Sequence, residues 1–354
     1  MPTDRFYPLP VEPGKRRMTI LAEGCFSPLG AKTAVCLIRY IPDEVVAVID
    51  SSRAPSTVQE ALGFGGDIPI VSSLEASLAH DPDMLVLGTA PRGGMLTDGE
   101  RTVIVAALSA RLHVINGMHR FLNEDGELVR LARSAGVVMW DVRRPPPDLG
   151  VSSGEECPFC PVILTVGSDC NTGKMTAAME IVRGLASRGR RAGFAASGQT
   201  GIMITGSGIP VDRVVADFIG GATERLILEI AAGNDYVILE GQGSIIHPGY
   251  AGVTVGMMAG GLPRGLILCH QPTRTVVRNY TVPIPPLPAL IALYEEAIRG
   301  IRKVPVVGLA LNTFDLDEKS AREAVAGAHA ETGLPATDPV RFGADGLVDA
   351  IVGM

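Results

Sequence analysis

Short hydrophobic runs alternate with amphipathic stretches along most of the chain. Runs that are apolar throughout, rather than at every second position, predict strands buried on both faces of a parallel sheet. The stretches between them carry apolar residues at helical spacing, which predicts helices on both faces of the sheet. The predicted fold class is therefore α/β, with two doubly wound, mostly parallel sheets. In the first part of the chain, we expect strands at Thr19–Ala22, Glu44–Ile49, Met84–Leu87, Leu112–Ile115 and Val137–Trp140.

The alternation stops at a proline run within residues 143–147. Three consecutive prolines cannot continue a helix or a central strand, so they indicate a stiff linker. A length of 354 residues also exceeds what one hydrophobic core usually serves. We therefore expect an N-terminal extension over 1–17, a first α/β domain over 18–144, a linker over 145–160 and a second α/β domain over 161–354.

The same alternation restarts after the linker. A long amphipathic stretch, Asp212–Ala232, predicts a single helix there. The weakly charged stretch Ala251–Cys269 is interrupted by Pro263, Arg264 and several glycines, so we expect no membrane span. Strands are expected at Val162–Val166, Ala192–Ala196, Tyr236–Leu239, Gly265–Cys269 and Val304–Leu311.

The first strand of this second part leads directly into a glycine-containing turn and then a predicted helix. Glycines let backbone N–H groups turn toward an anion, and the helix points its positive end at the same place. Lys174 adds a cation and is one of only five lysines against 26 arginines. This context is typical of a phosphate-binding P-loop. The expected cofactor-binding residues are Gly167, Ser168, Asp169, Cys170, Asn171, Thr172, Gly173, Lys174, Met175 and Thr176.

Met175 occupies the position at which a P-loop normally carries the Ser or Thr that binds Mg²⁺. A thioether is a poor ligand for this hard cation. The next residue, Thr176, points about 100° further round the helix. The loop is therefore expected to hold a phosphorylated ligand without cleaving it.

Two candidate catalytic residues lie at or after the end of one predicted strand, where open α/β sheets bind ligands. Glu240 ends the strand Tyr236–Leu239 and can act as a general base, or simply cap nearby backbone. His247 titrates near neutrality and is a second candidate for the base. Backbone N–H groups of the glycine-rich stretch 198–208 are candidates for stabilising an oxyanion. The expected substrate-binding residues, among them arginines that can pair with a carboxylate, are Gln199, Gln242, Ser244, Arg274, Arg278 and Arg92.

The first part of the chain carries a weaker signal. The segment Gly24–Thr33 follows the first strand but lacks both a Gly-Lys pair and the GxGxxG pattern of dinucleotide sites. Asp50 ends the second strand, where an acid that binds a ribose would sit. A dinucleotide site is therefore only weakly supported.

Charge and cysteine content restrict the partners and the setting. A net charge of −7 argues against a nucleic-acid partner, because such domains usually carry a basic balance. Six cysteines are too few for a disulfide framework, and the N-terminus has no apolar signal segment. A cytoplasmic protein that acts on a small molecule, without a membrane or nucleic-acid partner, is expected.

Several segments together resemble one bacterial family that combines a Rossmann-like and a P-loop domain, long catalogued as a domain of unknown function. Members have been assigned as D-glutamate N-acetyltransferases. The resemblance runs from about Met18 to the C-terminus, and it implies acetyl-CoA as donor, a D-amino acid as acceptor and a homodimer. The segments include Ala22–Gly24, Gly65–Pro69, Trp140–Arg143, Ala196–Gly201, Glu240–Gly243, His247–Tyr250 and Asp338–Arg341.

The P-loop also resembles that of dethiobiotin synthetase, because five residues separate Gly167 and Gly173. In that comparison Asn312 corresponds to a residue that contacts adenine, which implies a cofactor-binding role here. Three functions stay open, in this order: the acetyltransferase, a ligase or kinase that uses ATP with Mg²⁺, and a non-catalytic nucleotide-sensing protein. The chirality of the acceptor comes from the family resemblance alone.

Overall fold

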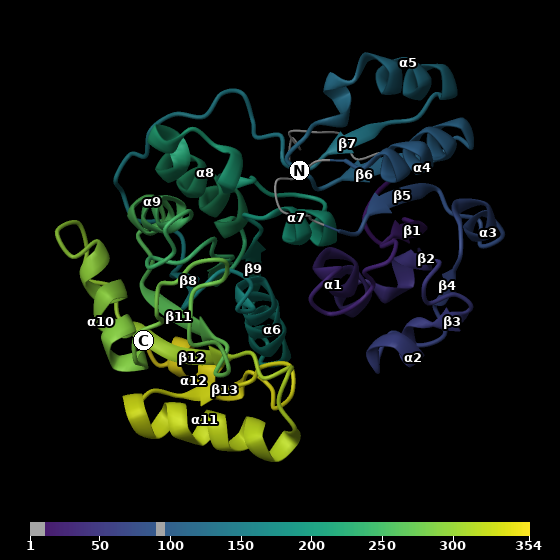
Figure 1. The fold of residues 1–354 in the computed structure, drawn as a ribbon. Coiled ribbons are helices and arrows are strands. Elements are labelled where there is room, and N and C mark those ends of the chain that lie inside the picture. The colour runs from purple at the N-terminus through teal and green to yellow at the C-terminus, as the bar shows by residue number, and fades with distance from the viewer. Residues whose placement is uncertain (1–10, 90–95) are drawn as a thin grey trace. The chain divides into compact units, whose positions relative to one another are not determined.

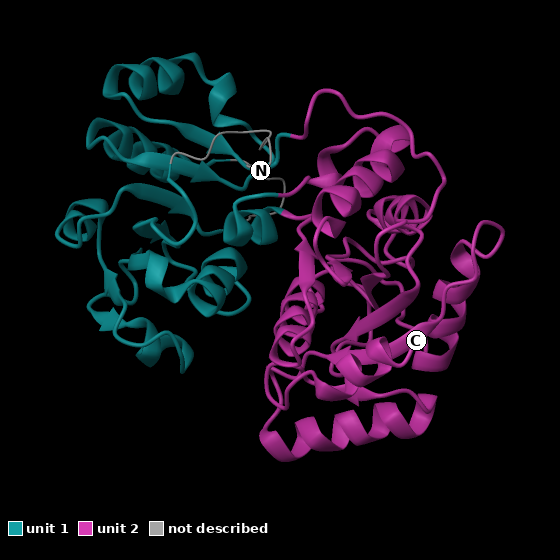
Figure 2. Cartoon of the chain, turned by 180° about the vertical axis from the view of Figure 1, so that it is seen from behind, with its two compact units in different colours: residues 1–144, 199–207 teal, residues 145–198, 208–354 magenta. Residues whose placement is uncertain are grey.

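The chain divides into two compact units, which Figure 2 draws in separate colours. This computed structural model describes residues 11–89 and 96–354. The first unit comprises Met1–Arg144 and Gln199–Ser207, and the second comprises Pro145–Gly198 and Gly208–Met354. The segment 199–207 therefore belongs to the first unit, although the sequence on either side of it belongs to the second.

A seven-stranded sheet forms the centre of the first unit, in the order β3-β4-β2-β1-β5-β6-β7. All neighbouring strands are parallel except the β3–β4 pair. The strands are β1 (Met18–Leu21), β2 (Val45–Ile49), β3 (Ser56–Thr57), β4 (Pro69–Val71), β5 (Met84–Leu87), β6 (His113–Asn116) and β7 (Met139–Asp141). The helices are α1 (Lys32–Tyr40), α2 (Val58–Leu62), α3 (Leu74–Leu78), α4 (Asp98–Ser109), α5 (Gly126–Ala135) and α7 (Gln199–Thr205).

A fully parallel six-stranded sheet forms the centre of the second unit, in the order β13-β12-β11-β8-β10-β9. Figure 1 shows α6 on one side of this sheet and α9 and α10 on the other. The strands are β8 (Val162–Gly167), β9 (Ala192–Ala195), β10 (Tyr236–Leu239), β11 (Gly265–His270), β12 (Val306–Leu311) and β13 (Ala336–Thr337). The helices are α6 (Lys174–Ser187), α8 (Ile219–Ala231), α9 (Ala251–Gly261), α10 (Leu287–Ala297), α11 (Glu318–Thr332) and α12 (Asp345–Val352).

The strand order of the second unit reverses beside β8. From β8 the chain continues to β9 and β10 on one side of it, and then crosses to β11 and β12 on the other. The carboxyl ends of parallel strands at such a reversal are where open α/β sheets bind ligands. The loops after β8, β10 and β11 are therefore the place to look for a site.

The predicted fold class is confirmed. Every strand expected from an apolar run is present, with ends that differ by two residues at most. Strands β1, β5 and β8 are buried along their whole length, as continuous apolar sequence predicts for central strands. The short strands β3, β4 and β13 have no such run and were not expected.

The prediction of one helix over Asp212–Ala232 is wrong. Two short 3₁₀ turns, Val211–Arg213 and Ala216–Phe218, precede helix α8. Between them Val214 (φ −84°, ψ 143°) has an extended backbone. This β-branched residue favours the extended conformation, so the apolar periodicity continues where the helix does not.

Helix α9 forms in a glycine-rich stretch in which no helix was expected. Glycine in a helix interior costs roughly 1 kcal/mol relative to alanine. Here Gly260 packs on Gly220 of α8 so closely that a Cβ at Gly260 would lie 2.2 Å from the Cα of Gly220. The glycines are therefore required for the contact between the two helices.

Asp50 stabilises the turn that follows β1. Its buried carboxylate accepts hydrogen bonds from the backbone N–H groups of Gly24 (3.1 Å) and Phe26 (3.0 Å) and from the Ser52 side chain (2.6 Å). Burial raises the pKa of Asp50, but these hydrogen bonds outweigh it and lower that pKa below its usual value. The carboxylate is therefore not free to bind a ribose.

A buried ion pair anchors α7 in the first unit. Arg16 pairs with Glu44 and donates to the backbone carbonyls of Met203 (2.5 Å) and Ile204 (3.1 Å). The carbonyls at a helix C-terminus lack partners within the helix, and Arg16 supplies them. Residues 11–17 thus include a structural contact and are not merely an appended segment.

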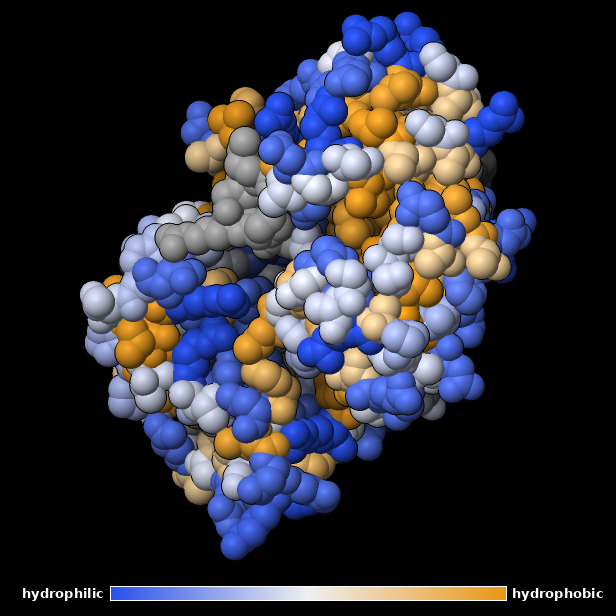
Figure 3. All heavy atoms as spheres, turned by 45° about the vertical axis from the view of Figure 1, so that its right-hand side comes forward, coloured by the Kyte–Doolittle hydropathy of each residue, from blue (hydrophilic) through white to orange (hydrophobic). Residues whose placement is uncertain are grey.

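No helix among the described residues is both long enough and apolar enough to cross a membrane. The face drawn in Figure 3 carries hydrophilic residues with hydrophobic areas between them. Apolar surface interspersed with polar residues is ordinary for folded proteins.

We expect Arg16→Met to lower the free energy of unfolding by about 3–5 kcal/mol, because it leaves the buried Glu44 carboxylate without its partner. Urea unfolding followed by circular dichroism measures this. The matched control is Arg299→Met, which removes an exposed ion pair with Glu296 and should cost less than about 1 kcal/mol. Equal unfolding midpoints for the two variants would contradict the role given to Arg16.

Candidate active site

The P-loop, residues 167–176, connects the end of β8 to the start of α6. At Gly167 the backbone passes so close to the loop that a Cβ would lie 2.6 Å from the Thr172 hydroxyl and 2.9 Å from the Lys174 amine. Asn171 (φ 55°) and Gly173 (φ 99°) adopt left-handed backbone conformations. Turns of this kind direct successive N–H groups into a concavity that binds anions.

The two positions after Gly173 differ in what they offer a ligand. The buried Lys174 amine donates to the backbone carbonyl of Asp169 (2.8 Å), so its charge lies within the loop. Met175 is buried in the core, and Thr176 is half-buried. The loop therefore retains the cation of a P-loop, while its Mg²⁺-binding hydroxyl is absent from the usual place.

A fully buried carboxylate lies at the tip of the loop. Asp169 accepts hydrogen bonds from the N–H groups of Cys170 (2.7 Å) and Arg278 (2.7 Å) and from Nη1 of Arg274 (3.0 Å). Nη1 of Arg274 also donates to the carbonyl of Cys170 (2.6 Å). The loop after β11 is thereby fastened to the P-loop. The predicted carboxylate-binding arginine 274 is engaged within the protein, whereas the side chain of Arg278 is exposed.

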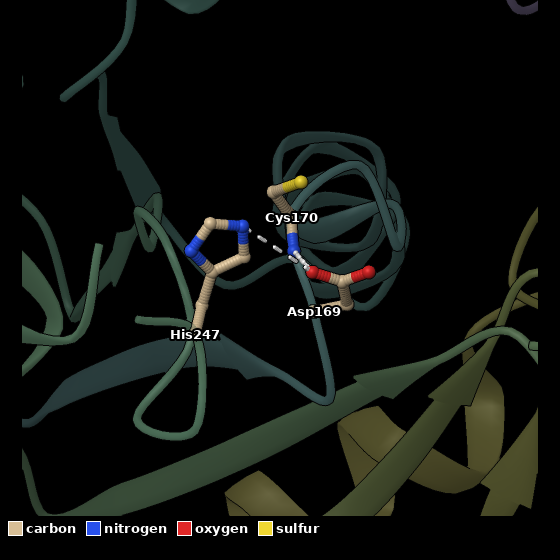
Figure 4. A group of neighbouring side chains, drawn as sticks. All are labelled: Asp169, Cys170 and His247. Atoms are coloured by element: carbon tan, nitrogen blue, oxygen red, sulfur yellow. Dashed lines mark hydrogen bonds and ion pairs between the residues drawn. The ribbon is translucent and has the colours of Figure 1, made fainter. Parts of the chain in front are cut away.

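The buried imidazole of His247 faces the Asp169 carboxylate, with Nε2 3.9 Å from Oδ1 (Figure 4). Its Nδ1 accepts a hydrogen bond from the N–H of Gly249 (3.1 Å), which places the proton of the neutral ring on Nε2. Burial lowers the pKa of His247, and this outweighs the opposite effect of Asp169. The ring is therefore neutral near pH 7 and presents a hydrogen-bond donor to the site.

Asp169, Cys170 and His247 each place one atom of a metal-binding type within 4.8 Å of the others (Figure 4). Binding through Nε2 would require its proton to move to Nδ1, where the Gly249 N–H already points. The neighbouring cations of Lys174 and Arg274 disfavour a further cation, and burial raises the pKa of the Cys170 thiol. The group suits an anion site held by hydrogen bonds better than a metal site.

Glu240 lies at the end of β10, and one of its oxygens accepts the N–H groups of Ser197 (3.1 Å) and Gly198 (3.1 Å). Gln242 donates to the Ser197 hydroxyl (3.0 Å). This strand end adjoins the P-loop, because a Cβ at Gly241 would lie 3.3 Å from Cδ of Lys174. The acid thus caps backbone, as one interpretation proposed, and also lies beside the lysine of the loop.

Most of the stretch 198–208, whose backbone N–H groups were candidates for stabilising an oxyanion, is helical. The N–H of Gly198 is bound to Glu240, and Gln199–Thr205 forms helix α7 of the first unit. Gln199 therefore lies in the first unit, and the other described residues predicted for the site lie in the second. Arg92 lies outside the described residues.

Two residues of the site were not assigned a role from the sequence. The fully buried Tyr294 of α10 donates to the Gly167 carbonyl (2.7 Å) and accepts from the Ile245 N–H (3.1 Å), and burial raises its pKa to about 12. His270 ends β11 with Nδ1 2.9 Å from the Ser168 hydroxyl. Position at a strand end could have identified His270, but nothing in the sequence marks Tyr294, which is 127 residues from Gly167.

The remaining predicted residues lie at the same edge of the sheet. Ser244 is fully buried, with its hydroxyl 3.5 Å from that of Tyr294. Asn312 follows β12. A Cβ added at Gly173 would lie 3.7 Å from the Cβ of Asn312. An amide next to the last glycine of the P-loop can pair with the edge of a purine through both its donor and its acceptor.

The chain matches two family models, which together cover residues 51–145 and 152–348. Residues 51–145 match the Rossmann-like domain of the DUF1611 family, and residues 152–348 match its P-loop domain, each described as a domain of unknown function. The crystal structure of a DUF1611 family protein from Anabaena variabilis is similar, with a TM-score of 0.92 and 41% sequence identity. That comparison covers 96% of this chain and 100% of the other.

Two relatives carry a functional name. A D-glutamate N-acetyltransferase from Tritonibacter scottomollicae is 35% identical over 336 residues, which are 91% of this chain and 94% of that protein. A D-glutamate N-acetyltransferase from a Pseudoalteromonas species is 34% identical over 265 residues, which are 74% of this chain and 79% of that protein.

We expect His270 to make the stability of the protein depend on pH. Burial and, secondarily, Arg274 lower its pKa from 6.5 to about 4. Between these values the unfolded chain takes up a proton that the folded protein does not. The His270 contribution is therefore complete above pH 6.5 and is lost as the pH falls toward 4, by up to about 3 kcal/mol.

Urea unfolding of wild type and His270→Asn at pH 7 and pH 4 tests this. The free energy of unfolding should fall less in the variant than in the wild type. His329→Asn, at an exposed position of α11, is the control and should follow the wild type. Parallel losses in His270→Asn and wild type would refute the assignment.

Proposed function

The chain belongs to the DUF1611 family, and on this basis we propose that it is an N-acetyltransferase that moves the acetyl group of acetyl-CoA to the amino group of a D-amino acid, with D-glutamate as the first candidate. One structural observation carries the proposal: the P-loop keeps its backbone concavity and Lys174, but has buried Met175 where a Mg²⁺ ligand normally lies. Such a loop suits a ligand that is held by its phosphates and is not hydrolysed. The named relatives support acetyl transfer as the reaction.

The residues of the second unit fit CoA, which carries a pyrophosphate, a 3′-phosphate and an adenine. We assign the pyrophosphate to the N–H groups of the P-loop and to Lys174. We assign Asn312, which lies next to Gly173, to the adenine. Acetyl-CoA would supply an activated thioester, so no nucleotide needs to be cleaved.

In the proposed reaction, the amine nitrogen forms a bond to the acetyl carbonyl carbon, the C–S bond breaks, and the thiol leaves with a proton. The amine must first lose a proton, and we assign Glu240 as the base that accepts it. His247 carries its proton on Nε2, so we assign it as a hydrogen-bond donor to negative charge in the site rather than as the base. The exposed Arg278 is the candidate for the acceptor carboxylate.

The proposal also includes the homodimer that the family resemblance implies and the cytoplasmic setting expected from the low cysteine content. A dimer would have twice the mass of a chain of 37.1 kDa, which light scattering measures directly. A monomer at all concentrations would remove this part without affecting the reaction.

We expect the purified protein to release free thiol from acetyl-CoA when a D-amino acid acceptor is present. A panel of D- and L-amino acids would identify the acceptor and its chirality. Lys174→Ala should lower kcat/KM about 10- to 100-fold, because a charged hydrogen bond to phosphate is lost. Lys319→Ala, which removes an exposed lysine of α11, is the matched control and should retain wild-type activity.

The same assay separates the alternatives. No thiol release with any amine would end the transferase proposal, and release of ADP from ATP with Mg²⁺ would favour the ligase or kinase. Full activity of Lys174→Ala would remove the P-loop from the mechanism.

We expect Glu240→Gln to lower kcat about 10²- to 10⁴-fold with little change in KM, because an amide cannot accept the proton. The Gln oxygen can still accept the N–H groups of Ser197 and Gly198, so the fold should survive. Glu295→Gln is the control, since that carboxylate also accepts a backbone N–H, from Val306 (3.0 Å). Similar kcat values for both variants would mean that Glu240 only binds backbone N–H groups and is not the base.

A further inference from the structure

We propose that Arg274 supplies the positive charge that Mg²⁺ supplies in most P-loop proteins, so that the second unit binds phosphate groups without a metal ion. The inference rests on the proposed function only in naming CoA as the physiological ligand. The chemistry concerns any diphosphate that enters the P-loop. Arg274 thereby acquires a different role from the carboxylate binding predicted from the sequence.

The first step is the charge that a diphosphate brings. Phosphate oxygens in a P-loop are normally neutralised by a lysine together with Mg²⁺, which a Ser or Thr hydroxyl holds. Here Lys174 is present, but Met175 stands at the hydroxyl position and is buried. Part of the ligand charge therefore requires another cation.

Arg274 is the cation that the structure places at this loop. Its guanidinium bonds to the Asp169 carboxylate (3.0 Å), the Cys170 carbonyl (2.6 Å) and Oε1 of Gln271 (2.5 Å). The first two partners belong to the P-loop itself. The side chain is only 14% exposed, so its position is set before any ligand binds. A group fixed in this way loses little entropy when it contacts a ligand.

The guanidinium keeps donors for a ligand. Both N–H groups of Nη1 and one of Nη2 are used in the three contacts, which leaves Nε–H and one Nη2–H without a partner among the described residues. An arginine can present two donors to two oxygens of one phosphate. Arg274 is therefore both held by the loop and able to bind an anion.

The charges around Asp169 favour an anion as well. Arg274 binds its carboxylate and Lys174 binds its backbone carbonyl, so two cations surround one carboxylate. His247, the third polar side chain on this acid, is neutral near pH 7 because burial lowers its pKa. The positive charge of Arg274 is permanent, since the guanidinium stays protonated.

Isothermal titration of the full chain tests the proposal, with ADP, CoA and pyrophosphate as probes, in excess EDTA and in excess Mg²⁺. The wild-type Kd should agree within about twofold between the two buffers. In EDTA, Arg274→Met should weaken binding of each probe about tenfold or more, the loss expected for a charged hydrogen bond. Arg274→Lys keeps the positive charge but lacks the paired donors of a guanidinium. It should bind each probe more tightly than Arg274→Met does.

The matched control is Arg191→Met, which removes an exposed arginine bonded to Asp235 (2.7 Å) in the same unit, and it should bind as the wild type does. Adenosine separates a phosphate contact from a structural role, because Arg274→Met should leave its binding unchanged. Thermal unfolding confirms that each variant is folded. If Arg274→Met does not fold, Arg274→Lys with pyrophosphate supplies the test and should bind more weakly than the wild type.

Three results would overturn the proposal. The first is a wild-type Kd that is at least tenfold lower in Mg²⁺ than in EDTA. The others are an Arg274→Met Kd equal to that of the wild type, or no binding of any probe. Failure of the proposed function would look different. Binding in EDTA without thiol release would refute acetyl transfer and leave the role of Arg274 in place. Thiol release with Mg²⁺-dependent binding would do the reverse.

Discussion

A buried carboxylate inside an anion-binding loop is the constraint on which the site depends. An ionised acid that is removed from water is costly unless charge and hydrogen bonds offset the cost. Asp169 meets this requirement with the Arg274 guanidinium and the N–H groups of Cys170 and Arg278. Two of these three donors, from Arg274 and Arg278, belong to the loop after β11, so burial of the acid fixes that loop against the P-loop.

Tyr294 connects the third loop of the site in the same way. Its hydroxyl is shared between Gly167, at the start of the P-loop, and Ile245, in the loop after β10. Both partners are backbone groups, so the contact constrains the path of the chain rather than the identity of a side chain. The loops after three neighbouring strands are therefore held together by buried polar contacts. These contacts determine the positions of side chains that the loops carry, such as His247 and Arg274.

The sequence predicted features whose cause is local and missed those whose cause is distant. Continuous apolar runs located the central strands, and the glycines with Lys174 located the P-loop, because sterics and helix geometry act within a few residues. Helix α9 was missed because its glycines oppose a helix, and only the contact between Gly260 and Gly220 explains them. The assignment of α7 to the first unit depends on Arg16, about 190 residues away, which no local pattern reveals.

The hydrogen-bond partners of site residues are also not visible in the sequence, and they determine which groups can accept a proton. From its residue type, His247 was as good a candidate for a general base as Glu240. The N–H of Gly249 decides otherwise, because it occupies the Nδ1 lone pair and leaves the proton on the nitrogen that faces Asp169. A neutral imidazole that presents N–H can stabilise negative charge but cannot accept a proton at that atom. For this reason our proposal assigns the proton of the amine to a carboxylate, and names Glu240, beside Lys174 at the end of β10, as that acid.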